Sequence, residues 1–139
     1  LHPTGGRSEA SPAEPLGQLS HRAVTAAMMR AGAVISASRY EPFGLAALEG
    51  ARAGAPLVLS DIPVYRELWR GAALFFDPLD PQELADQLDR IAADRELGEE
   101  IGSLALARSR GYTRDRQART MLALWRGVLH TPACADACP

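Results

Sequence analysis

The sequence predicts an α/β fold in which helices cover both faces of a parallel sheet. Two short runs, 33–37 and 56–60, are apolar along their whole length instead of alternating, as strands buried on both faces are. A segment of helix-forming composition lies between them, so the two strands are expected to run in the same direction. The 139 residues, 47% of them hydrophobic, suffice for one small domain with a core.

Composition excludes several classes of function. The net charge of −2 creates no field that would gather nucleic acid. All fifteen basic residues are arginine, which excludes any chemistry that needs a lysine of this chain. No apolar run approaches the ~20 residues that cross a bilayer, and the first residues do not resemble a signal peptide. We expect a soluble, cytoplasmic protein, peripheral to a membrane at most, and the initial Leu1 suggests a fragment or a processed end.

The two ends of the chain differ from its middle. Residues 1–15 are rich in Gly, Pro and Ser and predict a loose arm, residues 16–130 the folded domain, and residues 131–139 a disordered tail. The only cysteines, Cys134 and Cys138, fall in that tail without a neighbouring histidine, which leaves a labile disulfide or adventitious metal as the alternatives to an unstructured end. The histidines also lack metal-ligand spacing, so no metal site and no cofactor are expected.

Capping residues divide the chain into further elements. Ser20 predicts the start of a helix that stops at Gly32, and its expected buried face is Val24, Ala27, Met28 and Ala31. Beyond the 56–60 strand we expect a short helix over 64–70 and a strand over 73–76.

Three helices complete the predicted domain. Asp80, Asp94 and Thr113 predict their starts, with Glu83 completing an approximate capping box and Gly111 closing the second helix. Their expected apolar faces are Leu84, Leu88, Ile91 and Ala92; then Leu97, Ile101, Leu104 and Ala105; then Ala118, Met121, Leu122, Trp125, Val128 and Leu129.

The stretch 38–49 carries the candidate site. Pro42 disfavours helical geometry at Glu41, so a loop follows the first strand and a helix begins at about Gly44. The backbone N–H groups of Gly44, Leu45 and Ala46 would then lack intrahelical partners and form an anion site suited to a diphosphate. Glu49 lies five residues further on, roughly 7.5 Å along the helix at 1.5 Å per residue, where it could accept the hydroxyls of a ribose.

Three blocks in order carry a family resemblance. They are Glu-Pro-Phe-Gly-Leu-x-x-Leu-Glu over 41–49, Ala-Gly-x-Pro-Leu-Val over 53–58 and Ser-Asp-Ile-Pro-x-x-Arg-Glu over 60–67. Together they resemble the retaining GT-B glycosyltransferases of family 4, over about residues 16–129. The resemblance implies the C-terminal half of a Rossmann-like nucleotide-sugar domain, a three-layer α/β fold.

The resemblance also implies residue roles. Glu41 would face the hydroxyls of the donor sugar, the backbone of Phe43, Gly44 and Leu45 would hold the sugar and its diphosphate, and Glu49 would bind the ribose. The reaction would be metal-independent transfer of a sugar, with retention, from a nucleoside diphosphate donor to an acceptor hydroxyl. The alternatives are that Glu41 only caps the helix and that Glu49 is a solvated helix carboxylate.

Other residues near this stretch also have structural interpretations. Arg39 could reach a phosphate or lie on the surface. Arg66 and Glu67 could contact the nucleotide, or an ion pair there could hold the short helix. Tyr40 and Phe43 are expected to pack rather than to stack on a ligand. His21, at a helix start, is expected on the surface.

Several parts that the family uses are not in this sequence. The arginine and lysine that neutralise the leaving diphosphate belong to earlier strands, and Arg7 is the only basic side chain before Ser20 apart from histidine. The N-terminal domain that forms the acceptor site, and that the last helix braces, is also missing. We therefore expect the isolated chain to be inactive and to self-associate. The alternatives are a non-catalytic nucleotide-binding or pairing module completed by a separate chain and, less in keeping with the Glu-Pro-Phe-Gly block, a sugar-nucleotide epimerase.

Overall fold

One parallel three-stranded sheet forms the centre of the molecule. The computed structural model describes residues 14–130, in which strands β1 (Val34–Ser36), β2 (Leu57–Ser60) and β3 (Leu74–Phe76) pair in the order β1-β2-β3. Val34 is level with Leu57 across the first pair, and Val58 with Leu74 across the second. The predicted parallel sheet is confirmed, and each observed strand lies within its predicted range.

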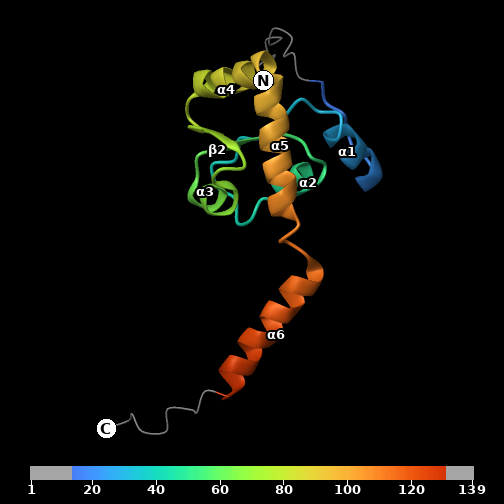
Figure 1. Cartoon of the computed structure of the whole chain (residues 1–139), viewed down its shortest axis with the longest axis vertical. Helices are drawn as coiled ribbons and strands as arrows, with labels where there is room; N and C mark the ends of the chain where they lie inside the picture. The colour runs from blue at the N-terminus through green and yellow to red at the C-terminus, as the bar shows by residue number, and fades with distance from the viewer. Residues whose placement is uncertain (1–13, 131–139) are drawn as a thin grey trace, which may run out of the picture.

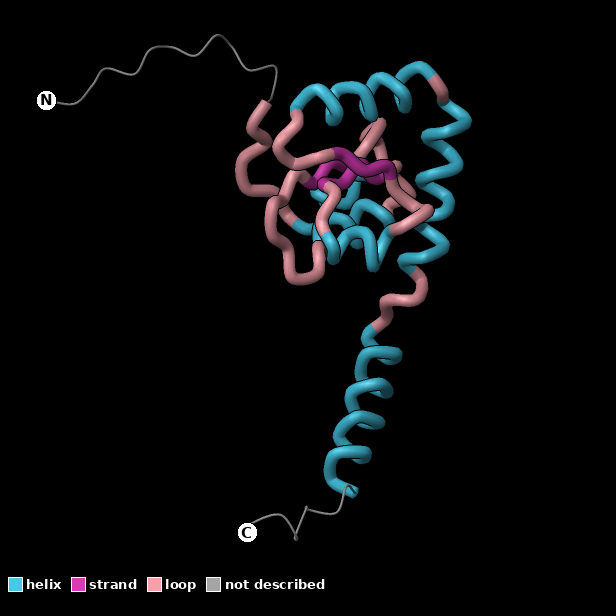
Figure 2. The backbone as a smooth tube through the Cα atoms, turned by 90° about the vertical axis from the view of Figure 1, so that its left-hand side faces the viewer, coloured by secondary structure: helices cyan, strands magenta, loops and turns pink. Residues whose placement is uncertain are grey.

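The described part of the chain has six helices. They are α1 (His21–Met28), α2 (Leu45–Arg52), α3 (Pro63–Trp69), α4 (Pro81–Ala93), α5 (Arg95–Ser109) and α6 (Arg114–His130). In Figure 1, α4 lies above the sheet and α2 and α3 below it, while α5 runs down the middle of the view past both levels. Figure 2 shows the same layers from the side and shows α6 leaving the body of the molecule. The predicted three-layer α/β architecture is confirmed.

The core surrounds the middle strand. All four residues of β2 are buried, and the largest fully buried side chains beside them are Tyr65 and Trp69 of α3. The prediction that β1 is covered on both faces is wrong in part, because Ile35 is 45% exposed. β1 pairs only with β2 and lies at the edge of this sheet, so fewer helices reach it.

The predicted helix starts are confirmed by side-chain caps. Ser20 Oγ accepts the N–H of Ala23, Asp94 Oδ1 accepts that of Leu97, and Thr113 Oγ1 accepts that of Arg116. These caps form because each side chain precedes its helix in an extended or turn conformation and reaches forward to an unpaired backbone donor.

The capping box at Asp80 is only half formed. Asp80 Oδ1 accepts the N–H groups of Gln82 and Glu83, as predicted. Glu83, however, does not reach back to the Asp80 N–H but accepts the N–H of Asp77, at 2.6 Å. The turn after β3 brings the Asp77 N–H within its reach and so takes up the carboxylate.

Two predicted helix faces are corrected by the packing. Ala92 of α4 is exposed, and Leu104 of α5 is 41% exposed. The buried face of α5 is made mainly of small residues: Gly98, Ile101, Gly102, Ala105 and Ser109. A Cβ at Gly102 would lie 2.5 Å from the Gly54 carbonyl oxygen, so this face allows α5 to lie close against the turn before β2.

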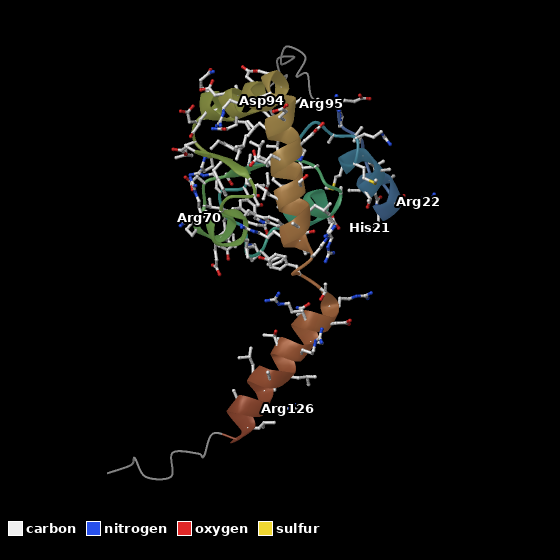
Figure 3. All side chains as sticks on the ribbon, viewed as in Figure 1. His21, Arg22, Arg70, Asp94, Arg95 and Arg126 are labelled. Atoms are coloured by element: carbon white, nitrogen blue, oxygen red, sulfur yellow. The ribbon has the colours of Figure 1, made fainter. Side chains whose placement is uncertain are left out.

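The first and last helices contribute little to the core. No residue of α1 is buried, although its predicted apolar face is half-buried. On α6 the large apolar side chains are 50–74% exposed: Met121, Leu122, Leu124, Trp125, Val128 and Leu129. Figure 3 shows that α6, which carries the labelled Arg126, stands away from the body. The predicted self-association stays untested.

Two of the predicted segments lie at the ends of the chain. The predicted arm lies almost wholly, and the tail with Cys134 and Cys138 wholly, outside residues 14–130. Within the described range, no helix is both long enough and apolar enough to span a membrane.

Candidate functional site

The predicted site lies where the first two parallel strands end. The loop from Ala37 to Gly44 follows β1, and Asp61 and Ile62 follow β2. These two ends are joined directly, because the Ser60 hydroxyl donates a hydrogen bond to the Ser38 carbonyl. Ligands of open α/β folds bind at this edge of the sheet.

Glu41 is bonded to the start of α2. Its Oε1 atom accepts the N–H of Gly44 at 3.0 Å and lies 3.5 Å from the N atom of Phe43. Glu41 therefore bonds the residue that precedes α2, and in the described part of the chain no side chain caps the N–H groups of the helix itself. The Gly44 N–H has no intrahelical partner, as predicted, but the half-buried Glu41 side chain accepts it, so this N–H is not open to an anion.

Two donors of the predicted anion site remain. The first N–H of α2 that reaches a helical carbonyl is that of Leu48, which donates to Gly44. Among residues 14–130, no acceptor lies within bonding distance of the Leu45 and Ala46 N–H groups. They stand at the positive end of the helix dipole and can still receive an anion.

The fold of the chain requires glycine at position 44. It is buried at the N-cap of α2 with φ of +88°, in the left-handed region that glycine adopts without strain. A Cβ there would lie 2.5 Å from Cε1 of Tyr65. The sequence suggested that Gly44 admits a ligand, whereas the structure shows that it admits the Tyr65 ring.

Glu49 faces the first helix. Its side chain is 41% exposed, and Oε1 lies 3.7 Å from Nδ1 of His21, whose side chain is 81% exposed. The predicted surface position of His21 is confirmed; Figure 3 labels it on α1, on the side of the body away from Arg70. Its approach to Glu49 was not predicted, because the two residues are far apart in sequence and belong to different helices.

The two aromatic residues of the loop behave differently. Phe43 packs edge-on against Tyr112, with ring centroids 5.7 Å apart, and contacts the core. Tyr40 is 85% exposed, so the prediction that it packs is wrong. It lies in the loop before Pro42, outside the turn that directs Phe43 inward.

Arg66 forms the predicted ion pair, with Asp61 as partner. Its Nε and Nη2 atoms donate to the two oxygens of the Asp61 carboxylate, and its guanidinium lies 4.2 Å from the centre of the Phe75 ring. The hydrogen bond from Arg66 lowers the pKa of Asp61, and the guanidinium charge adds to that effect. This pair ties the loop after β2 to α3. Arg39, by contrast, is exposed.

A cavity of about 1200 Å³ adjoins the site and includes Phe43 and Leu45 in its lining. Its arginines come from several elements: Arg52, Arg66, Arg70, Arg108, Arg114 and Arg116. Two of them bond backbone carbonyls, Arg52 that of Tyr112 and Arg108 those of Leu68 and Arg70. No spacing in the sequence indicated this gathering, because the segments meet only in the folded chain.

The family profile described as glycosyl transferases group 1 matches residues 14–107. The chain belongs to this family. The match contains the whole Glu41–Glu49 stretch, and it ends within α5, before α6 begins.

Relatives with assigned functions match a shorter stretch. A glycogen synthase from Mycobacterium tuberculosis is 53% identical over 47 residues, 34% of this chain and 11% of the relative. The O-antigen biosynthesis glycosyltransferase WclY from Escherichia coli is 43% identical over 49 residues, 35% of this chain and 14% of the relative. The chain thus spans a small part of the length of these enzymes.

A solved glycosyltransferase has the same fold. Sucrose-phosphate synthase from Thermosynechococcus elongatus superposes with a TM-score of 0.75 and 26% identity, over 82% of this chain and 29% of that one. The likeness confirms the α/β fold and its GT-B relationship over most of the described chain.

Proposed function

We propose that this chain holds the donor in a retaining, metal-independent glycosyltransferase of family 4, which transfers a sugar from a nucleoside diphosphate sugar to an acceptor hydroxyl. The observation that carries the proposal is the geometry of Glu41 at the start of α2. One carboxylate oxygen is held by the backbone, and the other, Oε2, has no hydrogen-bond partner among the described residues. A carboxylate held in this way is preorganised to accept sugar hydroxyls.

The bond from the Gly44 N–H and the sugar contact are therefore compatible roles for Glu41. Its bonded oxygen fixes the direction of the carboxylate, and the free one receives the ligand. The Leu45 and Ala46 N–H groups are the donors that we assign to the diphosphate. These N–H groups stabilise the leaving diphosphate more strongly as it gains negative charge, as catalysis by preorganised dipoles requires.

Glu49 is the residue that we assign to the ribose. It lies further along α2 than the anion donors, on the part of the helix that α1 approaches. Its side chain is exposed enough to accept two hydroxyls, and His21 is its neighbour at 3.7 Å rather than a tight partner. A bound ribose would therefore displace only a weak contact between exposed groups.

Transfer requires more of the enzyme than this chain. The solved relative is more than three times as long as the part that matches. We assign the acceptor site and the basic residues around the diphosphate to an N-terminal GT-B domain, and we expect the isolated chain to bind the donor nucleotide without turning it over.

Calorimetric titration of the chain with UDP, GDP and ADP, each with and without magnesium, tests this proposal. We expect one nucleotide to bind independently of magnesium and Glu49→Ala to weaken it roughly tenfold or more, because hydrogen bonds to a charged group contribute about 1.5–3 kcal/mol. Glu100→Ala, at an exposed carboxylate of α5, is the matched control and should bind normally. Failure of the wild type to bind any of the three, or equal binding by both variants, would overturn the assignment.

A further inference from the structure

We propose that Tyr65 of α3 is a positioning residue. It holds the loop that contains Glu41, residues 37–44, in place without touching the ligand. This inference rests on the proposed function of that loop. Tyr65 is fully buried, so its side chain is not offered to solvent or substrate. It acts through two contacts, one made by the ring and one by the hydroxyl.

The ring sets the position of Gly44. Because an added Cβ at Gly44 would lie 2.5 Å from Cε1 of Tyr65 and 3.3 Å from its hydroxyl, the ring packs directly beneath the glycine backbone. The Gly44 N–H is in turn the principal donor to Glu41, at 3.0 Å. Any movement of the ring is therefore passed to the carboxylate through one backbone unit.

The hydroxyl connects the ring to the other end of the loop. It lies 2.6 Å from Ser36 Oγ, at the end of β1, and Ser36 Oγ lies 3.3 Å from Ser38 Oγ. The Ser38 carbonyl also accepts a hydrogen bond from the buried Ser60 hydroxyl at the end of β2. Residues 38 and 44 are thus both anchored, and Glu41 lies between them.

The Tyr65 hydroxyl distinguishes a positioning role from a role in filling the core alone. A phenylalanine would fill the same space, since the ring contact with Gly44 is through a carbon atom. The hydroxyl links α3 to Ser36, and a buried hydroxyl pair of this kind is costly to break from one side. A binding group must be held within about 0.5 Å of its productive position, and supporting hydrogen bonds of this kind serve that purpose.

The test uses four variants of the complete chain. Tyr65→Phe and Ser36→Ala remove the two ends of the hydroxyl pair, whereas Ser36→Thr retains it. Tyr112→Phe is the matched control, because the Tyr112 ring also packs near the site and its hydroxyl has no partner among the described residues. Amide hydrogen exchange of Gly44, measured by NMR without ligand, reports the anchoring directly.

We expect exchange at Gly44 to become roughly tenfold faster in Tyr65→Phe and in Ser36→Ala, about the effect of one hydrogen bond, and to stay unchanged in Ser36→Thr and Tyr112→Phe. Amides in β2 should keep their protection, which separates a local effect from general destabilisation. Nucleotide affinity should fall several-fold in the same two variants.

Two results separate this proposal from the proposed function. Unchanged Gly44 exchange in Tyr65→Phe would overturn the role of Tyr65 whatever the chain binds. Faster exchange together with no nucleotide binding by the wild type would support the anchoring and overturn the function assigned to the loop. If Tyr65→Phe does not fold, Ser36→Ala tests the same hydroxyl pair from β1.

Discussion

Replacing Gly44 by alanine should destabilise the chain more than the same replacement at a glycine of similar backbone conformation. Gly44 has φ of +88° and Gly71 has φ of +77°. A left-handed conformation costs an L-residue about 1–2 kcal/mol, a cost that both variants share. At Gly71 an added Cβ meets nothing within 4 Å, whereas at Gly44 it meets Tyr65 at 2.5 Å.

The difference between the two variants measures the contact with Tyr65. Overpacking of a buried site costs about 1–3 kcal/mol, so Gly44→Ala should lose roughly 2–5 kcal/mol of unfolding free energy and Gly71→Ala roughly 1–2. With an m-value of about 1–3 kcal/mol per molar, the excess corresponds to a difference on the order of 1 M in the urea midpoint.

Urea unfolding followed by circular dichroism gives both midpoints. Equal losses in the two variants would refute the argument, because they would show that the Tyr65 ring moves aside freely and that only backbone strain matters. A larger loss of unfolding free energy in Gly44→Ala than in Gly71→Ala would support the close packing on which the anchored loop depends.

Three further predictions test the fold and its electrostatics. Gly102→Ala should destabilise the chain by about 1–3 kcal/mol, because its Cβ would lie 2.5 Å from a backbone carbonyl oxygen. Gly98→Ala in the same helix has an ordinary nearest contact of 3.5 Å and should stabilise it by up to about 1 kcal/mol through helix propensity. Thermal unfolding of the two variants tests this difference. Asp80→Ala should cost about 1 kcal/mol in urea unfolding through loss of the α4 cap, and a loss as large in Asp80→Asn would contradict the capping role. The hydrogen bond from Arg66 lowers the folded-state pKa of Asp61 below its ordinary 3.8, so the pair stabilises above that pH and the contribution is lost as the pH falls through the lowered pKa. Because the pair is exposed, Asp61→Asn should cost under about 1 kcal/mol at pH 7 and nothing below the folded pKa; a difference that persists in acid would argue against the ion pair.

Local patterns in the sequence were sufficient for much of the fold. The caps at Ser20, Asp80 and Asp94 act on backbone donors two or three residues away, so the residue types alone indicate where the helices begin. The fully apolar run of β2 likewise predicts a strand covered on both faces, and its four residues are buried. The Glu41–Glu49 stretch also indicated the family, because the resemblance rests on short blocks of consecutive residues.

Only the tertiary structure decided what surrounds those residues. The ring under Gly44 belongs to Tyr65, and the neighbour of Glu49 is His21, each brought there by a different helix. Whether a strand is central or at an edge also depends on how the chain returns to the sheet, which is why Ile35 is exposed although β2 is not. Sequence patterns describe what one segment requires of its environment, whereas the partner that meets the requirement is chosen by contacts between segments distant along the chain.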